Sequence, residues 1–310
     1  MANETTLSTA AEFRLASVID MLSFAMMEEA RPSMVMSQFV KQYDISSQPS
    51  NVLDIPILND TGAASSLAEV TAASNTAVDP TEVSITVAKY VQNYDISDEV
   101  LASQVWSPVN IGAFTDGVIP AEVVGKLMPY AQLGGRALME AIETQLTALL
   151  GAHTTTVGSL GVNLSHTNFI TAMYELDAND AKGKKIAILH PIQVSDLRVA
   201  LGVATTTTSP LVVKQAENFI NDNPIYGFAG NLLGVDVYQS TLVPEIHTAA
   251  DRAGGMFIDQ LTYAIAFKWF PKLELSRTPK SFLSSLTSSV SFGVVEVRDG
   301  HGVSILTDHE

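Results

Sequence analysis

The 310-residue chain contains no cysteine, and only 16% of its residues are charged. Without cysteine, it can form neither a disulfide framework nor a thiolate metal site. So low a charged fraction is unusual for a soluble monomer, whose surface is normally rich in acidic and basic side chains. We therefore expect much of the surface to be covered by partners, although a large monomer could have the same composition.

Positive charge is especially scarce, since 17 Lys and Arg stand against 33 Asp and Glu, which gives a net charge of −16. Binding to nucleic-acid phosphates requires clustered Lys and Arg, so the composition argues against a nucleic-acid-binding face. Copies of the same acidic chain repel one another, and salt screens this repulsion. Any self-assembly is therefore expected to depend on salt.

Long apolar runs are also absent. The longest candidate, Met256 to Phe270, is broken by polar residues such as Asp259 and Lys268, and so falls short of the roughly 18 apolar residues of a membrane span. The start, Met1 to Ser8, has neither the basic nor the apolar region of a secretory signal. These features predict a soluble protein made in the cytoplasm, with no membrane partner.

The common catalytic and nucleotide-binding motifs, G-x-S-x-G, H-E-x-x-H, Walker A and G-x-G-x-x-G, do not occur. The six histidines are scattered without metal-ligand spacing. His190, followed by Pro191, could be interpreted as a catalytic base, but a hydrogen-bonded histidine at a strand-to-helix corner is much the better explanation. We expect no catalytic residue, no cofactor-binding residue and no metal ligand.

What the chain does contain is a long predicted hairpin between Val52 and Val91. Apolar residues occupy alternate positions in both halves: Leu53, Ile55 and Ile57, then Val83, Ile85 and Val87. Such alternation is typical of half-buried strands. The tip, Asn59 to Pro80, is mostly small or polar. A lone two-stranded hairpin is only marginally stable, so we expect a neighbouring copy to hold it.

A second candidate contact region is an N-terminal arm. Thr9 to Glu12 fits a helix capping box, and an apolar helical stripe follows as far as Arg31 and Pro32. Half of the ten methionines lie in this region: Met21, Met26, Met27, Met34 and Met36. Methionine adapts to irregular surfaces, so the arm could lie on several neighbours. A helix packed on its own core is an equal alternative.

Ile119 to Leu150 predicts one long helix that stops at Gly151. Its expected buried stripe is Leu138, Ile142, Leu146 and Leu149. Pro129 and the pair Gly134-Gly135 are expected to kink or divide this helix.

From His166 onwards, shorter elements alternate. A helix over Phe169–Leu176, a buried strand over Ile186–Leu189 and a helix beginning at Pro191 are predicted. The later predicted strands are 232–238, 256–258, 262–269, 272–276, 289–298 and 303–306. Asp299 to Gly302 is expected to close a hairpin between the last two. The fold class is α+β.

The order of arm, long hairpin, long helix and compact C-terminal region resembles the major capsid protein of tailed phages, the Johnson fold first seen in Hong Kong 97 phage. Three groups of residues carry the resemblance. They are Leu176–Asp180 followed by Ile188–Pro191, Leu233–Ser240 with Pro244, and Gly255–Asp259 leading into Tyr263–Ala266.

The resemblance implies a phage capsid (Johnson) fold with an N-terminal arm, an extended β-hairpin loop, a long spine helix, and peripheral and axial domains. The implied ranges are the arm at 1–48, the extended loop at 49–98, the peripheral domain with the spine helix at 99–165, the axial domain at 166–250, and late strands returning to both domains at 251–310. The chain would self-assemble as hexamers and pentamers into an icosahedral shell.

This shell would enclose double-stranded DNA without sequence-specific binding, and the acidic subunits would let the DNA slide. Scaffold, portal and decoration proteins are the further partners implied, in a virion assembled in the host cytoplasm. Some relatives crosslink through a lysine of the extended loop, but no lysine lies between Lys41 and Lys89, so no such crosslink is expected. Because the chain begins almost at its arm, we expect a separate scaffold or none, and no cleavage near residue 100.

Two other functions remain open at this stage. An encapsulin-type nanocompartment shell shares the fold but packages an enzyme instead of DNA. A soluble α/β hydrolase acting through His190 is the remote alternative.

Overall fold

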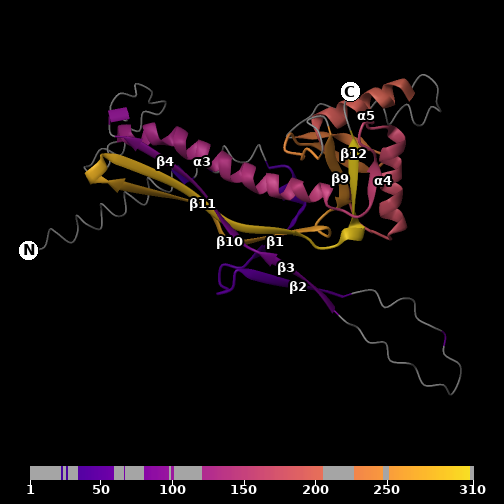
Figure 1. Ribbon diagram of the computed structural model, residues 1–310, viewed down its shortest axis with the longest axis horizontal. Coiled ribbons are helices and arrows are strands. Elements are labelled where there is room, and N and C mark those ends of the chain that lie inside the picture. The colour runs from indigo at the N-terminus through magenta and orange to yellow at the C-terminus, as the bar shows by residue number, and fades with distance from the viewer. Residues whose placement is uncertain are drawn as a thin grey trace, which may run out of the picture.

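The computed structural model describes residues 22–23, 26, 34–58, 66, 80–97, 99–100, 121–204, 227–246 and 251–307. Most of the predicted arm helix, most of the hairpin tip, and Met21 and Met27 lie outside these residues. Within them, the architecture is α+β, as predicted. Figure 1 shows an elongated part with a long helix along it, a compact part at one end, and a hairpin that projects from the underside.

The elongated part is a four-stranded sheet. Its strands, in spatial order, are β1 (Lys41–Asp44), β10 (Tyr263–Thr278), β11 (Leu283–Glu296) and β4 (Ala88–Ser97). β1 runs parallel to β10, whereas the β10–β11 and β11–β4 pairs are antiparallel. With 16 residues, β10 spans roughly 50 Å at the usual rise of a strand.

The sequence predicted β10 as two strands, and this is wrong. Irregularities in its pairing with β11 lie between Phe267 and Lys272, and pairing resumes on both sides of them. A β-bulge of this kind bends a strand without ending it.

The predicted long helix is α3 (Ala121–Ala148), followed by the 3-10 turn η3 (Leu149–Gly151). Its 28 residues give a length of about 42 Å. Leu138, Ile142 and Leu146 are buried as predicted, and Leu149 is half-buried.

Pro129 and the two glycines do not divide this helix, because α3 is continuous through all three. The other form of the prediction, a kink at these residues, stays a prediction. The glycines permit close packing. A side chain at Gly134 would collide with Ser288 of β11, and one at Gly135 would collide with the main chain of Met26.

The compact part is a six-stranded sheet flanked by two helices. Its order is β5 (Thr156–Gly158), β12 (Gly302–Thr307), β9 (Arg252–Ile258), β6 (Lys185–Leu189), β8 (Val235–Gln239) and β7 (Phe228–Leu232). The helices α4 (His166–Ala178) and α5 (Pro191–Ala204) share one apolar core with this sheet. The predicted helices over α4 and α5 and the predicted strand β6 are therefore confirmed, including the start of α5 at Pro191.

Two connections in the compact part differ from prediction. Residues 232–238 do not form one strand, because Leu233 and Gly234 have φ of +55° and +85° and turn the chain from β7 into β8. Successive positive φ values are typical of a type I′ hairpin turn. Asp299 to Gly302 closes no hairpin either: it carries the chain from β11 in one sheet to β12 in the other, and Asp299 accepts the main-chain N–H of Thr154.

The projecting hairpin consists of β2 (Val52–Leu58) and β3 (Pro80–Thr86), which pair only with each other among the described strands. The prediction of a second strand running unbroken to Val91 is wrong. At Val87, whose N–H donates to the carbonyl of Asn51, the chain leaves the hairpin and enters β4.

In the described residues, no helix is both long and apolar enough to span a membrane.

We predict that Gly135→Ala destabilises the protein by about 1–3 kcal/mol, because the added methyl group overpacks against the main chain of Met26. In an unconstrained helix the same change would stabilise by about 1 kcal/mol. Thermal and urea unfolding measure the effect. Gly300→Ala is the control, since nothing lies within 4 Å of its added methyl group. Equal or greater stability of Gly135→Ala would contradict the assigned packing.

Candidate functional site

The hairpin β2–β3 has one apolar face and one exposed face. Its register pairs Leu53 with Ile85 and Ile55 with Val83, so their side chains share one side of the ribbon. The opposite side carries polar pairs such as Asp54 and Ser84, where the Ser84 hydroxyl donates to Asp54 Oδ1 at 2.6 Å. The apolar face is therefore the one that packs.

The base of the hairpin packs on the elongated sheet of the same chain. Ile85 and Val87 are buried against Ala264 and Ala266 of β10. The two alanines are small, and Gly293 on β11 has no side chain that would collide with the carbonyl of Thr86. Small residues on the sheet thus let the hairpin approach closely.

A lysine fixes the entry to the hairpin. The ammonium group of Lys268 donates to the carbonyl of Ser50 at 3.0 Å and to Asn51 Oδ1 at 2.6 Å, and it lies 3.4 Å from the carbonyl of Pro49. An ammonium group has three donors, so this site satisfies all of them with loop acceptors. The loop before β2 is therefore tied to β10.

The far end of the hairpin is exposed. Leu58, the last residue of β2, has 68% of its surface exposed, although it is apolar. A hollow of about 290 Å³ lies between the hairpin and the body, and Ile57, Leu58, Leu261 and Arg298 are among its lining residues. Exposed apolar side chains beside a hollow of this kind are typical of surfaces that contact other proteins.

A second region joins the N-terminal part of the chain to α3. The carboxylate of Glu143 accepts the N–H groups of Val35 at 3.1 Å, Met36 at 2.5 Å and, at a longer 3.4 Å, Ser37. These groups open the 3-10 helix η2 (Met36–Phe39), whose free N–H groups need acceptors. Burial raises the pKa of Glu143, and the three main-chain N–H groups oppose that shift.

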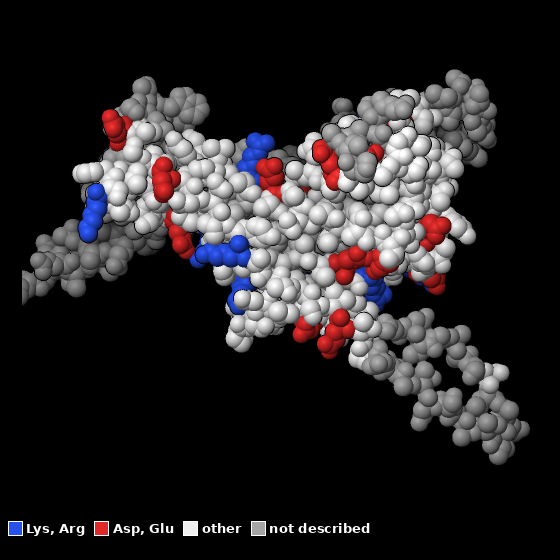
Figure 2. Space-filling model, viewed as in Figure 1, with Lys and Arg blue, Asp and Glu red and all other residues white. Residues whose placement is uncertain are grey.

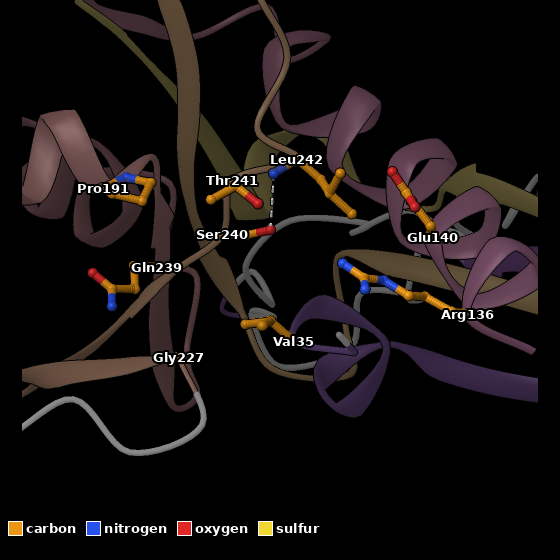
Figure 3. A pocket seen from close by; sticks show the side chains of 9 residues that line it. All are labelled: Val35, Arg136, Glu140, Pro191, Gly227, Gln239, Ser240, Thr241 and Leu242. Carbon is orange, nitrogen blue, oxygen red and sulfur yellow. Dashed lines mark hydrogen bonds between the residues drawn. The ribbon is translucent and has the colours of Figure 1, made fainter. Parts of the chain in front are cut away.

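Beside this junction is a cavity of about 270 Å³, shown in Figure 3. Its lining residues are Val35, Arg136, Glu140, Pro191, Gly227, Gln239, Ser240, Thr241 and Leu242. The Ser240 hydroxyl accepts the N–H of Leu242 at 3.3 Å. None of these described lining residues is a histidine, so the cavity does not hold a serine–histidine pair of the kind that a hydrolase uses.

His190 lies at the corner between β6 and α5, as the non-catalytic interpretation predicted. Its ring Nδ1 accepts the main-chain N–H of Ile192 at 3.3 Å, and its main-chain N–H donates to Gln193 Oε1 at 2.9 Å. Burial and the positive charge of Arg252 lower the pKa of His190. These contacts account for His190 as part of a strand-to-helix corner.

The structure divides the predicted contact residues into three groups. Met26, Met36, Ile85 and Val87 are buried in the chain's own core, whereas Met34, Leu53, Ile55, Ile57 and Val83 are half-buried. Met21 and Met27 lie outside the described residues. Contact of any of them with a second copy stays a prediction. For the four buried residues the packing within one chain is a sufficient explanation.

Sequence reasoning missed Glu143 and Lys268. Glu143 left a signal that could have been used, because it lies on the same side of α3 as the buried Met139 and Leu146. A charged residue in an apolar stripe indicates a buried partner. The role of Lys268 could not be predicted from nearby residues, since its acceptors are more than 200 positions away along the chain.

Charge on the face seen in Figure 2 follows the composition. Acidic side chains are spread over both parts of the molecule, while blue side chains stand singly or in small groups among white ones. Phosphate-binding surfaces gather Lys and Arg into one patch or stripe. This face does not have that pattern.

No family model and no curated protein sequence matches the chain. Several solved structures do. A chain of Mycobacterium phage Che8 has a TM-score of 0.64 at 18% identity, with 87% of this chain and 90% of that one covered. The capsid of cyanophage P-SCSP1u has a TM-score of 0.60 at 14% identity, with 90% of each chain covered. A virus-like particle from Pyrococcus furiosus has a TM-score of 0.57 at 9% identity, with 93% of this chain and 98% of that one covered.

These similarities extend over both sheets and are too distant in sequence to carry more than the fold. The chain has the α+β fold of tailed-phage capsid proteins. The predicted resemblance to the Johnson fold is confirmed at this level.

We predict that Glu143→Leu destabilises the protein by about 3 kcal/mol, because it leaves buried N–H groups at Val35 and Met36 without an acceptor. Glu143→Gln is the matched control, since its amide oxygen can still accept both. The raised pKa of Glu143 also sets a pH dependence.

Because the folded protein holds the proton more tightly than the unfolded chain, the wild type should gain stability relative to Glu143→Gln as pH falls from 7 through the raised pKa. Urea unfolding at several pH values measures both effects. A wild type that loses stability relative to Glu143→Gln on acidification would contradict the direction of this shift.

Proposed function

We propose that this chain is a major capsid protein, which self-assembles as hexamers and pentamers into an icosahedral shell enclosing double-stranded DNA. The observation that carries the proposal is the extent of the shared fold: about nine-tenths of this chain and of the cyanophage capsid chain superimpose. The similarity therefore extends well beyond a single sheet or a common core motif. In this proposal the protein is located in the virion.

The hairpin supports the proposal because its two ends differ. Its base is buried on the chain's own sheet through Ile85 and Val87, while Leu58 at the far end is exposed. A fixed base and an exposed apolar end suit a contact that reaches adjoining copies. Shell positions that are similar but not identical need contacts that are individually modest.

The two sheets suggest how the domains divide. We assign α3 and the long strands β4, β10 and β11 to the peripheral domain, and the six-stranded sheet with α4 and α5 to the axial domain. The late strands then return to both domains, since β9 and β12 join the compact sheet and β10 and β11 the elongated one. The arm at 1–48 and the loop at 49–98 complete the assignment.

The packaged DNA would be held without sequence-specific contacts. The net charge of −16 repels phosphate and favours a DNA that slides along the inner wall. Scaffold, portal and decoration proteins are the other proposed partners, with assembly in the host cytoplasm. The main alternative, an encapsulin-type shell, would differ in its cargo, and the virus-like particle from Pyrococcus furiosus has the same fold.

Electron microscopy of the purified particles, with their A260/A280 ratio, tests the proposal. We expect closed icosahedral particles, with a nucleic-acid absorbance when isolated from cells that carry the whole virus, and assembly that improves as salt screens the net charge. Small particles free of nucleic acid would favour the nanocompartment. A monomer at every salt concentration would overturn both shells and favour the hydrolase.

We predict that Leu58→Asp prevents particle formation and leaves the fold of the single chain unchanged, because 68% of this residue's surface is exposed in one subunit and surface substitutions seldom destabilise. Leu58→Met is the matched control, which keeps an apolar contact and should assemble. Sedimentation velocity separates particles from free subunits, and circular dichroism reports the fold. Normal assembly of Leu58→Asp would show that this end of the hairpin makes no essential contact.

A further inference from the structure

A cluster of ligating side chains lies where the two sheets meet. His153 follows the end of α3, Glu296 ends β11, and Asp299 lies in the short 3-10 turn η5 (Asp299–His301) that leads into β12. One nitrogen of His153 and one carboxylate oxygen from each acid lie within 4.8 Å of one another. None of these three side chains lines the hollow beside the hairpin or the cavity beside α3.

The two separations that involve His153 fit donors around a single metal ion. His153 Nδ1 lies 3.0 Å from Glu296 Oε1 and 3.5 Å from Asp299 Oδ1. Two donors bound tetrahedrally to one zinc ion at about 2.0–2.1 Å are about 3.3 Å apart. The measured separations bracket that value.

The buried histidine nitrogen has no hydrogen-bond partner among the described residues. The His153 side chain is wholly buried, and neither its Nδ1 nor Glu296 Oε1 has a partner in hydrogen-bond geometry, although the two atoms are 3.0 Å apart. Glu296 Oε1 therefore lies off the axis on which Nδ1 would donate or accept. A cation on that axis would satisfy both atoms, whose burial without partners is otherwise costly.

The surroundings hold the three side chains in place. His153 Nε2 lies 2.5 Å from the hydroxyl of Tyr263, and a ligating histidine usually bonds through its second nitrogen in this way. The main-chain N–H of Thr154 donates to Asp299 Oδ1 at 2.9 Å, and its hydroxyl donates to Oδ2. Gly302 leaves room for the imidazole, with which any side chain there would collide.

We propose that His153, Glu296 and Asp299 bind a divalent transition-metal ion, of which zinc is the representative. One imidazole and two carboxylates suit zinc, whereas magnesium and calcium prefer sites made of oxygen ligands alone. The side chain of Asp299 is 46% exposed, so the ion can enter from solvent and water can take the fourth position. The bound ion would join the end of α3, the end of β11 and the start of β12.

The test is zinc titration of the full-length chain after chelator treatment and dialysis. We expect one zinc per chain by calorimetry and elemental analysis, and a higher Tm in zinc that a chelator reverses, because an ion bound to the folded state stabilises it. Magnesium at the same concentration should not compete. These readouts do not depend on particle assembly, so they stand or fall separately from the capsid proposal.

Two variants locate the site. Glu296→Gln and Asp299→Asn nearly keep the side-chain shape, and each should weaken zinc binding by at least about tenfold. The matched controls are Asp180→Asn, an exposed acid in the turn after α4, and His190→Asn, a histidine that is not part of the cluster. Both should bind zinc as the wild type does. If Glu296→Gln fails to fold by circular dichroism, the more exposed Asp299 carries the test. The proposal would be overturned if the wild type bound no stoichiometric zinc, or if both site variants bound zinc as tightly as the wild type.

Discussion

The packing of α3 against both sheets is the constraint on which the arrangement of the molecule depends. Apolar side chains from the second half of α3 share one core with Val290 and Phe292 of β11 and with Ile186 and Ile188 of β6. This shared core fixes the position of one sheet relative to the other. The long helix runs along the elongated part and reaches the compact part (Figure 1), and the chain also passes directly between the two sheets from β9 to β10 and from β11 to β12.

The sequence predicted elements whose signals are local. The alternation around Leu53 and Ile57 identified β2, and Pro191 marked the start of α5. The same kind of signal could not show where β3 ends, because period-two alternation continues past Val87 while the pairing partner changes from β2 to β11. Alternation reports which face is buried, and it does not report the strand on the other side.

The candidate site was less predictable than the fold, for a related reason. Glu143 accepts hydrogen bonds from main-chain groups more than 100 residues away along the chain. His153 meets Glu296 only because the segment after α3 and the end of β11 lie at the same place. Spacing along a chain cannot reveal ligands that topology brings together. Gly134 and Gly135 were misinterpreted in the same way: their conformational freedom suggested a break, but their missing side chains make room for neighbours.

The way in which the hairpin is rooted has a mechanical consequence. β2 follows β1 through the loop 45–51, whereas β3 leads through Val87 directly into β4. β1 and β4 are the opposite edges of the four-stranded sheet, and in Figure 1 β3 prolongs the line of β4. A pull on the far end of the hairpin is therefore directed along β4, whose register with β11 runs from Ala88 to Ser97. Tension in that direction loads the whole ladder in shear, so its hydrogen bonds resist together instead of opening one by one.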